Sequence, residues 1–121
     1  MLKIFDLAAM PATPMENGRG RKVRLIDTRL TETLDVHMNT LAPGGPRGAL
    51  HKHSQSDNVY IVRSGEGELH VEGQTHTIHK DQIVFIPAGL KHSLSNISDA
   101  PFEIFEIYAP AGTEFDFVPC D

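Results

Sequence analysis

The stretch of sequence that decides the fold is residues 45–65, GPRGALHKHSQSDNVYIVRSG, in which a pair of histidines precedes a run that becomes apolar at Val59. Side chains in a β-strand alternate between two faces, so His51 and His53 are expected to share one face. Two imidazoles placed in this way can each present a ring nitrogen to one metal ion. The stretch therefore predicts a strand that carries part of a metal site.

The composition of the 121-residue chain is that of one globular domain that binds a small molecule. Hydrophobic residues make up 40% of it, which is enough to fill a single core. The formal net charge is −5, and Lys and Arg are scattered except between Arg19 and Arg24, so no nucleic-acid-binding surface is expected. The single cysteine, Cys120, indicates a reducing compartment. Lys3 and Asp6 interrupt the N-terminal stretch, and no apolar run is long enough to cross a membrane, so a cytoplasmic protein is expected.

Turn-forming and strand-forming residues divide the chain into an N-terminal arm and one barrel domain. Residues 1–22 form the arm, whose second half is rich in proline, glycine and charge, as in a loop. Residues 23–118 form the domain, in which short segments rich in Val, Ile, Leu, Phe and Thr alternate with turns that contain Gly and Pro. The expected strands are residues 23–30, 33–41, 58–63, 67–72, 75–79, 82–86, 92–97 and 102–109. This spacing predicts an all-β barrel or sandwich with little helix.

A second motif, PAGLKHSLSN, follows at residues 87–96, and the two together cover residues 45–96 in register. They resemble the paired motifs of the cupin superfamily, G(x)5HxH(x)3–4E(x)6G and G(x)5PxG(x)2H(x)3N. The resemblance implies an all-β cupin barrel of jelly-roll type, or double-stranded β-helix. It also implies one divalent transition metal ion (Fe, Mn, Ni, Cu or Zn) inside the barrel, with His51, His53 and His92 at the positions of the metal-binding histidines.

Asn58 stands where the cupin motif has a metal-binding glutamate. A neutral amide oxygen there would remove one negative charge from the site, which should weaken metal binding and make the ion a stronger Lewis acid. Asp57 is an alternative ligand, because the motif also allows three residues after His53. A slip of one residue turns the side chain to the opposite face, so Asp57 could bind only if a bulge reoriented it. Gln55, in the loop that leaves His53, is a more remote substitute.

Two residues on the expected inner wall of the barrel are candidates for catalysis. If Asn58 points inward, so does Tyr60, where its phenol could orient a substrate or pass a proton. In the last expected strand, either Glu103 or Glu106 must lie among apolar neighbours. The glutamate that lines the barrel is expected to have a raised pKa and to act as a base, and Glu106 is the candidate. His37 lies opposite apolar neighbours and is expected at the surface.

We expect a metal-dependent enzyme that acts on a small oxygenated organic substrate. A site of three histidines resembles that of small cupin dioxygenases, in which the substrate chelates Fe(II) and O₂ takes a remaining position, so a dioxygenase is the first hypothesis. The alternatives are a non-oxidative lyase or isomerase that acts on a carbonyl or sugar-acid substrate, and a non-enzymatic cupin that binds a small ligand or a metal. The resemblance also implies a homodimer that pairs through outer sheet faces and exchanged N-terminal strands.

Overall fold

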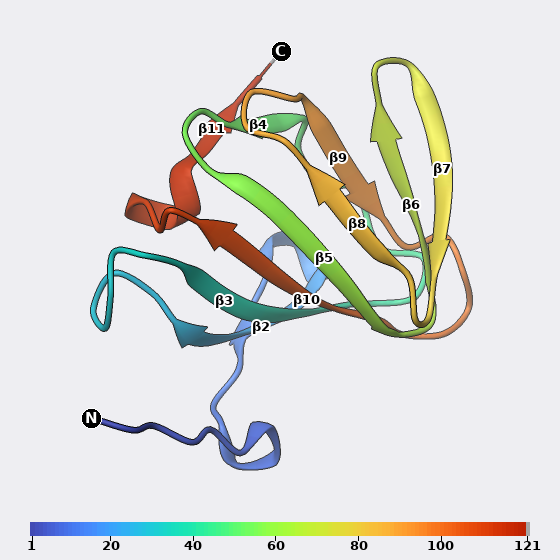
Figure 1. Ribbon diagram of the computed structural model, residues 1–121. Helices are drawn as coiled ribbons and strands as arrows, with labels where there is room; N and C mark the ends of the chain where they lie inside the picture. Colours follow the sequence, from blue (N-terminus) through green and yellow to red (C-terminus); the bar gives the residue numbers. More distant parts are fainter. Residues whose placement is uncertain (121) are drawn as a thin grey trace.

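The structure is a computed structural model that describes residues 1–120. Its strands are β1 (Thr13–Pro14), β2 (Gly20–Ile26), β3 (Asp35–Leu41), β4 (His51–His53), β5 (Asp57–Ser64), β6 (Glu66–Val71), β7 (Gln74–His79), β8 (Ile83–Ile86), β9 (His92–Ser95), β10 (Phe102–Ala109) and β11 (Phe117–Pro119). They form two antiparallel sheets, of order β1-β2-β3-β10-β5-β8 and β11-β4-β9-β6-β7, that enclose one interior (Figure 1). The predicted all-β barrel is confirmed.

Helical structure among residues 1–120 is limited to three single 3-10 turns, η1 (Leu7–Ala9), η2 (Glu16–Gly18) and η3 (Thr113–Asp116). The described chain contains no helix of the length and apolar character that crossing a membrane requires.

The sheets reach further along the chain than the sequence indicates. β1 and the first residues of β2 fall within the predicted arm, where Thr13 and Pro14 pair with β2 at the edge of the first sheet. A proline is tolerated at a sheet edge because no N–H is needed on the open side. β11, which was not among the expected strands, pairs with β4 so that Phe117 lies beside His53. The C-terminal segment therefore covers the strand that carries two of the histidines.

The interior of the barrel changes from apolar at one end to polar at the other. Along β10 the buried residues are Phe102, Ile104, Glu106 and Tyr108. The antiparallel neighbour β3 faces them with Leu41, Asn39, His37 and Asp35. On the other side of β10, β5 contributes Val62, Tyr60 and Asn58. All candidate site residues on these strands consequently lie toward the polar end.

The apolar end holds the hydrophobic core. The core is made of Leu41, Tyr60, Val62, Leu69, Ile78, Ile86, Leu94, Phe102 and Ile104. Burying each large apolar side chain contributes about 1.5–3 kcal/mol, so this cluster is a main source of stability. Phe102 lies so close to Gly67 that a Cβ there would be 2.4 Å from its ring, and only glycine fits at this point of β6.

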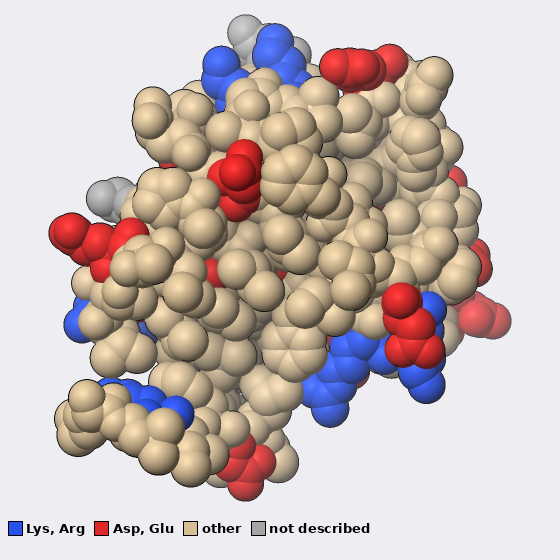
Figure 2. Space-filling model, viewed as in Figure 1, with Lys and Arg blue, Asp and Glu red and all other residues tan. Residues whose placement is uncertain are grey.

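The outer face of the first sheet is apolar as well. Across β8, β5, β10 and β3, one row of neighbouring residues is Phe85, Val59, Ile107 and Val36, and the next row is Ile83, Ile61, Phe105 and Met38. Ile83 and Phe85 keep 71% and 62% of their surface exposed. In the view of Figure 2, uncharged side chains cover most of the visible surface, and separate acidic and basic groups interrupt it. We call these eight residues the outer apolar face.

Candidate metal centre

Three histidines meet at the polar end of the barrel. His51 and His53 lie on the same face of β4, and His92, the first residue of β9, pairs directly with His51. The ring centroids are 4.3 to 5.3 Å apart. One ring nitrogen from each histidine lies within 4.8 Å of the other two. The folding of β4 against β9 thus brings the three predicted ligands together.

The backbone orients all three imidazole rings. Nδ1 of His51 donates to the carbonyl oxygen of Ala49 at 2.8 Å, Nδ1 of His53 to that of Phe115 at 2.9 Å, and Nδ1 of His92 to that of Leu90 at 2.9 Å. Because a carbonyl oxygen only accepts, each Nδ1 carries the proton and each Nε2 keeps a free lone pair. This is the usual arrangement of metal-binding histidines.

The free nitrogens have no other partner in the described chain. Nε2 of His53 and Nε2 of His92 are buried and make no hydrogen bond. Burial lowers the pKa of all three histidines, that of His51 to about 4, so the rings are neutral near pH 7. Buried polar nitrogens without partners are rare in folded proteins. Three neutral, converging nitrogens with open lone pairs fit a divalent transition metal ion.

Asn58, rather than Asp57, faces the interior beside this centre. Asn58 is fully buried between Ile86 of β8 and Tyr108 of β10, and neither polar atom of its amide has a hydrogen-bond partner among the described residues. Asp57 is exposed, and its carboxylate accepts a hydrogen bond from the backbone of Ala88 at 3.0 Å. Asn58 is therefore the residue that could add a ligand oxygen.

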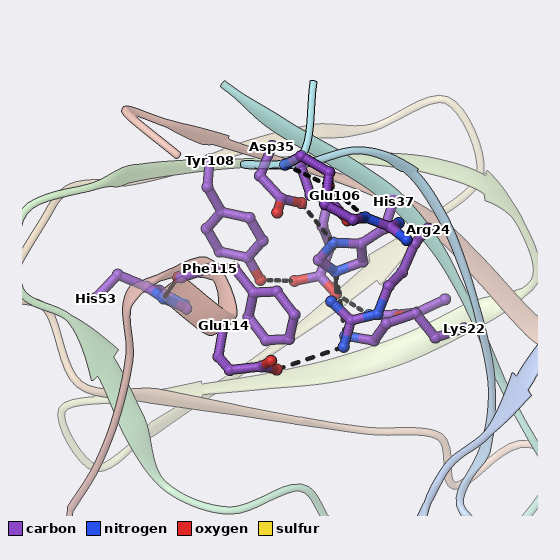
Figure 3. A network of polar contacts seen from close by, with 12 residues as sticks. Lys22, Arg24, Asp35, His37, His53, Glu106, Tyr108, Glu114 and Phe115 are labelled. Atoms are coloured by element: carbon purple, nitrogen blue, oxygen red, sulfur yellow. Dashed lines mark hydrogen bonds and ion pairs between the residues drawn. The ribbon is translucent and has the colours of Figure 1, made fainter. Parts of the chain in front are cut away.

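A buried polar network lies next to the histidines (Figure 3). Glu106 accepts a hydrogen bond of 2.7 Å from the Tyr108 hydroxyl and another from the Asn39 amide. Nε2 of His37 lies 3.4 Å from Glu106 Oε2 and 3.3 Å from Lys22 Nζ, and Nδ1 of His37 donates to Asp35 at 2.9 Å. The network thus extends from the cation of Lys22 to Tyr108.

Tyr108 links this network to the metal centre. The Tyr108 ring packs against His53 with centroids 4.5 Å apart. The charge of Glu106 also reaches the centre, since it opposes the fall in pKa of His51, His53 and His92. Glu106 itself lies outside the histidine cluster, so its carboxylate acts on the three imidazoles only through its charge.

The expected raised pKa of Glu106 is wrong. Burial alone would raise it, but contact with His37, the charge of Lys22 and the hydrogen bond from Tyr108 hold the pKa of Glu106 well below its usual range. Glu106 is therefore a buried carboxylate that stays ionised at neutral pH, and it can accept hydrogen bonds.

His37 was also misplaced by the sequence analysis. It is 1% exposed and faces the interior, whereas its apolar neighbours Val36 and Met38 belong to the outer apolar face. The polar and apolar side chains of this strand do alternate as expected. At this end of the barrel, however, the polar side chains point inward and the apolar ones point outward.

Tyr60 lies inside the barrel, opposite Glu106 on the neighbouring strand. Its ring centroid is 6.4 Å from that of His92. Burial, and then the charge of Glu106, raise the pKa of Tyr60 well above its usual value, so its phenol stays protonated at neutral pH and can donate a hydrogen bond. Two aromatic residues that the sequence analysis did not select, Phe115 and Phe117, also contact the site, because β11 lies beside β4.

The molecule is thus a small all-β barrel with a candidate metal centre of three histidines. The family model of the cupin domain matches residues 37–108, which is more than half of the chain. The chain belongs to the cupin family, as its two motifs predict.

Curated relatives share part of this domain. The chain is 31% identical over 77 residues to mannose-1-phosphate guanylyltransferase of Klebsiella pneumoniae, covering 64% of this chain and 16% of that protein. It is 31% identical over 67 residues to an oxalate-binding protein of Thermotoga maritima, covering 55% of this chain and 54% of the relative. The match therefore spans only a part of each of these relatives.

Solved structures support the fold. A protein with a double-stranded β-helix domain from Klebsiella pneumoniae superposes with a TM-score of 0.81 at 22% identity, covering 100% of this chain and 99% of the other. KdgF from Halomonas sp. superposes with a TM-score of 0.81 at 14% identity, covering 94% and 98%. A predicted oxalate decarboxylase from Thermotoga maritima gives 0.79 at 21% identity, covering 89% and 99%. At these identities the likeness establishes the shared fold.

Proposed function

We propose that this chain is a metal-dependent enzyme that acts on a small oxygenated organic molecule, and that its reaction is a dioxygenation. The observation that carries the proposal is the convergence of three neutral Nε2 lone pairs, from His51, His53 and His92, on one point in the barrel. Together with the amide oxygen of Asn58 they would hold a divalent transition metal. When bound, the ion would act as a Lewis acid toward a substrate oxygen and, as iron, would supply redox chemistry.

The surrounding residues would bind the substrate and manage protons. Tyr60, as a protonated phenol, can donate a hydrogen bond to a substrate oxygen. Glu106 holds a negative charge close to the centre and fixes the Tyr108 hydroxyl, which donates to Glu106 Oε1. The ring of Tyr108 packs against His53 and thereby helps to fix its orientation.

Dioxygenation is balanced without a further reductant, since both atoms of O₂ enter the organic product and O₂ is the oxidant. The neutral Asn58 supports this assignment. Without the negative charge of a carboxylate at this position, a bound ion would attract a chelating, negatively charged substrate more strongly.

Metal binding is the first test. Protein purified without an affinity tag is analysed for metals, together with His53→Ala and a control, His70→Ala. His70 is bonded to Thr75 and Ser95 at 3.1 Å each and lies outside the histidine cluster. We expect a bound transition metal in the wild type and in His70→Ala, and little in His53→Ala. Metal contents that are equal in all three would contradict the proposed centre.

Oxygen use is the second test. Iron-loaded protein is incubated with a library of small hydroxy and keto compounds under ¹⁸O₂, and O₂ consumption and isotope incorporation are measured. Two labelled oxygen atoms in the product support a dioxygenase. Turnover without O₂ consumption would overturn it and favour the non-oxidative alternative, a lyase or isomerase.

A further inference from the structure

A cavity of about 600 Å³ opens beside His51, and four cationic side chains are among the residues that line it. It lies between the strap that contains β1 and η2, the segment before β4, and the C-terminal segment. Its charged lining residues are Arg19, Lys22, Arg24, Arg47 and Glu16. Within a chain of net charge −5, the cavity next to the metal centre thus has four cations and one anion.

Two of these cations, Arg19 and Arg47, have no acidic partner in the described chain, and Lys22 has only the more distant charges of Glu106 and Asp35. Arg24 pairs with Glu114 at 3.4 Å, whereas no carboxylate of residues 1–120 lies within ion-pair distance of Arg19, Lys22 or Arg47. The cavity wall contributes one carboxylate, that of Glu16, against its four cations. A bound anion would balance the remaining positive charge.

Neutral contacts hold two of the guanidinium groups in place. Arg19 donates to the carbonyl oxygen of Leu94 at 3.1 Å and contacts the sulfur of Met15 at 3.7 Å, and its Nε is buried without a partner. Arg47 donates from Nε to the Ser93 hydroxyl at 2.9 Å. Such groups are oriented before a ligand arrives, which lowers the entropic cost of binding it.

Flat aromatic surfaces complete the wall. The Phe117 ring stacks on His51 with centroids 4.4 Å apart and planes 20° apart. Lys22 Nζ lies 4.1 Å from the centroid of the Phe115 ring, which Figure 3 shows beside Tyr108 and His53. A planar, unsaturated ligand body would fit against such rings.

We infer that the substrate is a small organic carboxylate with a planar, unsaturated body. Its carboxylate binds to Arg19, Lys22 and Arg47, and its body lies against Phe115 and Phe117, which brings it beside His51. This inference rests on the proposed function, since it names the substrate class of the proposed metal site.

The test uses benzoate and its neutral analogue benzamide as probes, with protein from which metal has been removed. Binding is measured by ¹H–¹⁵N NMR titration, whose spectra also report whether each variant is folded. We expect benzoate to bind roughly tenfold more tightly than benzamide, as one charge-assisted contact would give. The shifts should map to the cavity, and the affinity for benzoate should fall as NaCl is raised.

One double variant removes two cations from the cavity, a second keeps their charges, and two single variants remove cations elsewhere. Lys22→Gln combined with Arg47→Gln is expected to reduce the affinity for benzoate to that for benzamide. Lys22→Arg combined with Arg47→Lys keeps the charges and should restore the preference. Arg63 and Lys80 lie outside the cavity lining, so Arg63→Gln and Lys80→Gln should leave the preference for benzoate over benzamide unchanged. Equal affinities for the two probes in the wild type, or a preference that persists in the double variant, would overturn the inference.

The same titration with metal-loaded protein separates this inference from the proposed function. If benzoate is preferred in the absence of metal but no transition metal binds, the anion site stands and the metal centre fails. If metal binds but the two probes bind equally, the metal centre stands and the carboxylate assignment fails.

Discussion

Asn58 is the residue whose role is easiest to test by a single substitution. It is buried beside the histidines with both amide atoms unpartnered, so a carboxylate placed there would face the metal. We expect Asn58→Glu to tighten metal binding by roughly tenfold or more, because a buried negative charge attracts a divalent cation strongly. The same charge should destabilise the metal-free protein by a few kcal/mol, since it would be buried without its partner.

Competition with a coloured chelator measures the affinity, and thermal unfolding with and without metal measures the stability. Asp57→Asn serves as the control, because Asp57 points outward and bonds to Ala88. An unchanged affinity in Asn58→Glu, or a reduced one in Asp57→Asn, would show that position 58 does not face the ion.

Glu106 links the stability of the protein to pH. Its pKa in the folded chain lies below its ordinary value of 4.5, so its ionised form stabilises the fold above pH 4.5, and this contribution is lost as the pH falls below that value. We expect Glu106→Gln to cost about 1–3 kcal/mol at pH 7, because hydrogen bonds to a buried charge are lost. The difference from the wild type should shrink as the pH is lowered.

Urea unfolding at a series of pH values checks this expectation. Tyr108→Phe removes one hydrogen bond to Glu106 but keeps the carboxylate, so its stability should retain most of the pH dependence of the wild type. Parallel curves for the wild type and Glu106→Gln across the acid range would contradict the assignment.

At the scale of elements, the C-terminal segment holds the histidine strand in place. The carbonyl of Phe115 in η3 orients His53, and the carboxylate of the next residue, Asp116, accepts hydrogen bonds from Ser54, Gln55 and Ser56 just after β4. β11 then pairs along β4. The geometry of one ligand is thus set by a segment that contributes no ligand.

Removal of the Asp116 carboxylate should therefore weaken metal binding. We expect Asp116→Gly to reduce metal affinity by roughly tenfold, as is typical when support for a ligand histidine is lost. Glu114→Gly is the matched control, because Glu114 and Asp116 both have positive φ, 49° and 56°, and glycine relieves the backbone equally at each position. The Glu114 carboxylate bonds only to Arg24 among the described residues, so the metal affinity of Glu114→Gly should stay unchanged. An equal loss in both variants would assign the effect to the backbone.

The clustering of His51, His53 and His92 could be predicted from the sequence, and most of the surrounding wall could not. His51, His53 and His92 lie within short motifs whose spacing follows from the period of a strand and the length of a turn. The network around Glu106 is different, because His37 and Lys22 reach it from strands that are far apart in the sequence. Only the register of β2, β3 and β10 brings them together.

The outer strands of the barrel show a second limit of sequence reasoning. An apolar strand face normally marks the inside, but on β3 Val36 and Met38 face outward, and on β8 both faces are apolar. Alternation separates the two faces of a strand but does not say which one is covered by the same chain and which by another molecule. His37 was misplaced for this reason.

At the scale of the whole molecule, the outer apolar face indicates that the protein binds a second copy of itself. It is apolar across four strands, with Arg63 over Phe105 at its edge, so two copies that pair face to face would bury these apolar side chains. We expect a homodimer in solution that buries this face. Phe85→Lys, which places a charge on the face, should shift the protein to a monomer.

Light scattering coupled to size-exclusion chromatography measures the mass of each species. Leu30→Lys is the control, because Leu30 is 45% exposed but lies in the turn between β2 and β3, outside the outer apolar face. A monomeric wild type, or a dimer that survives Phe85→Lys unchanged, would count against pairing through this face.

The backbone hydrogen bonds of the three histidines have an evolutionary consequence. Carbonyl oxygens are present whatever residue occupies positions 49, 90 and 115, so no substitution there can delete the acceptor that aims each ring. The side chains that line the cavity can therefore change in evolution while the three imidazole rings keep their orientation. Substitutions in the cavity lining can therefore change which substrate binds without disturbing the geometry of the three histidines.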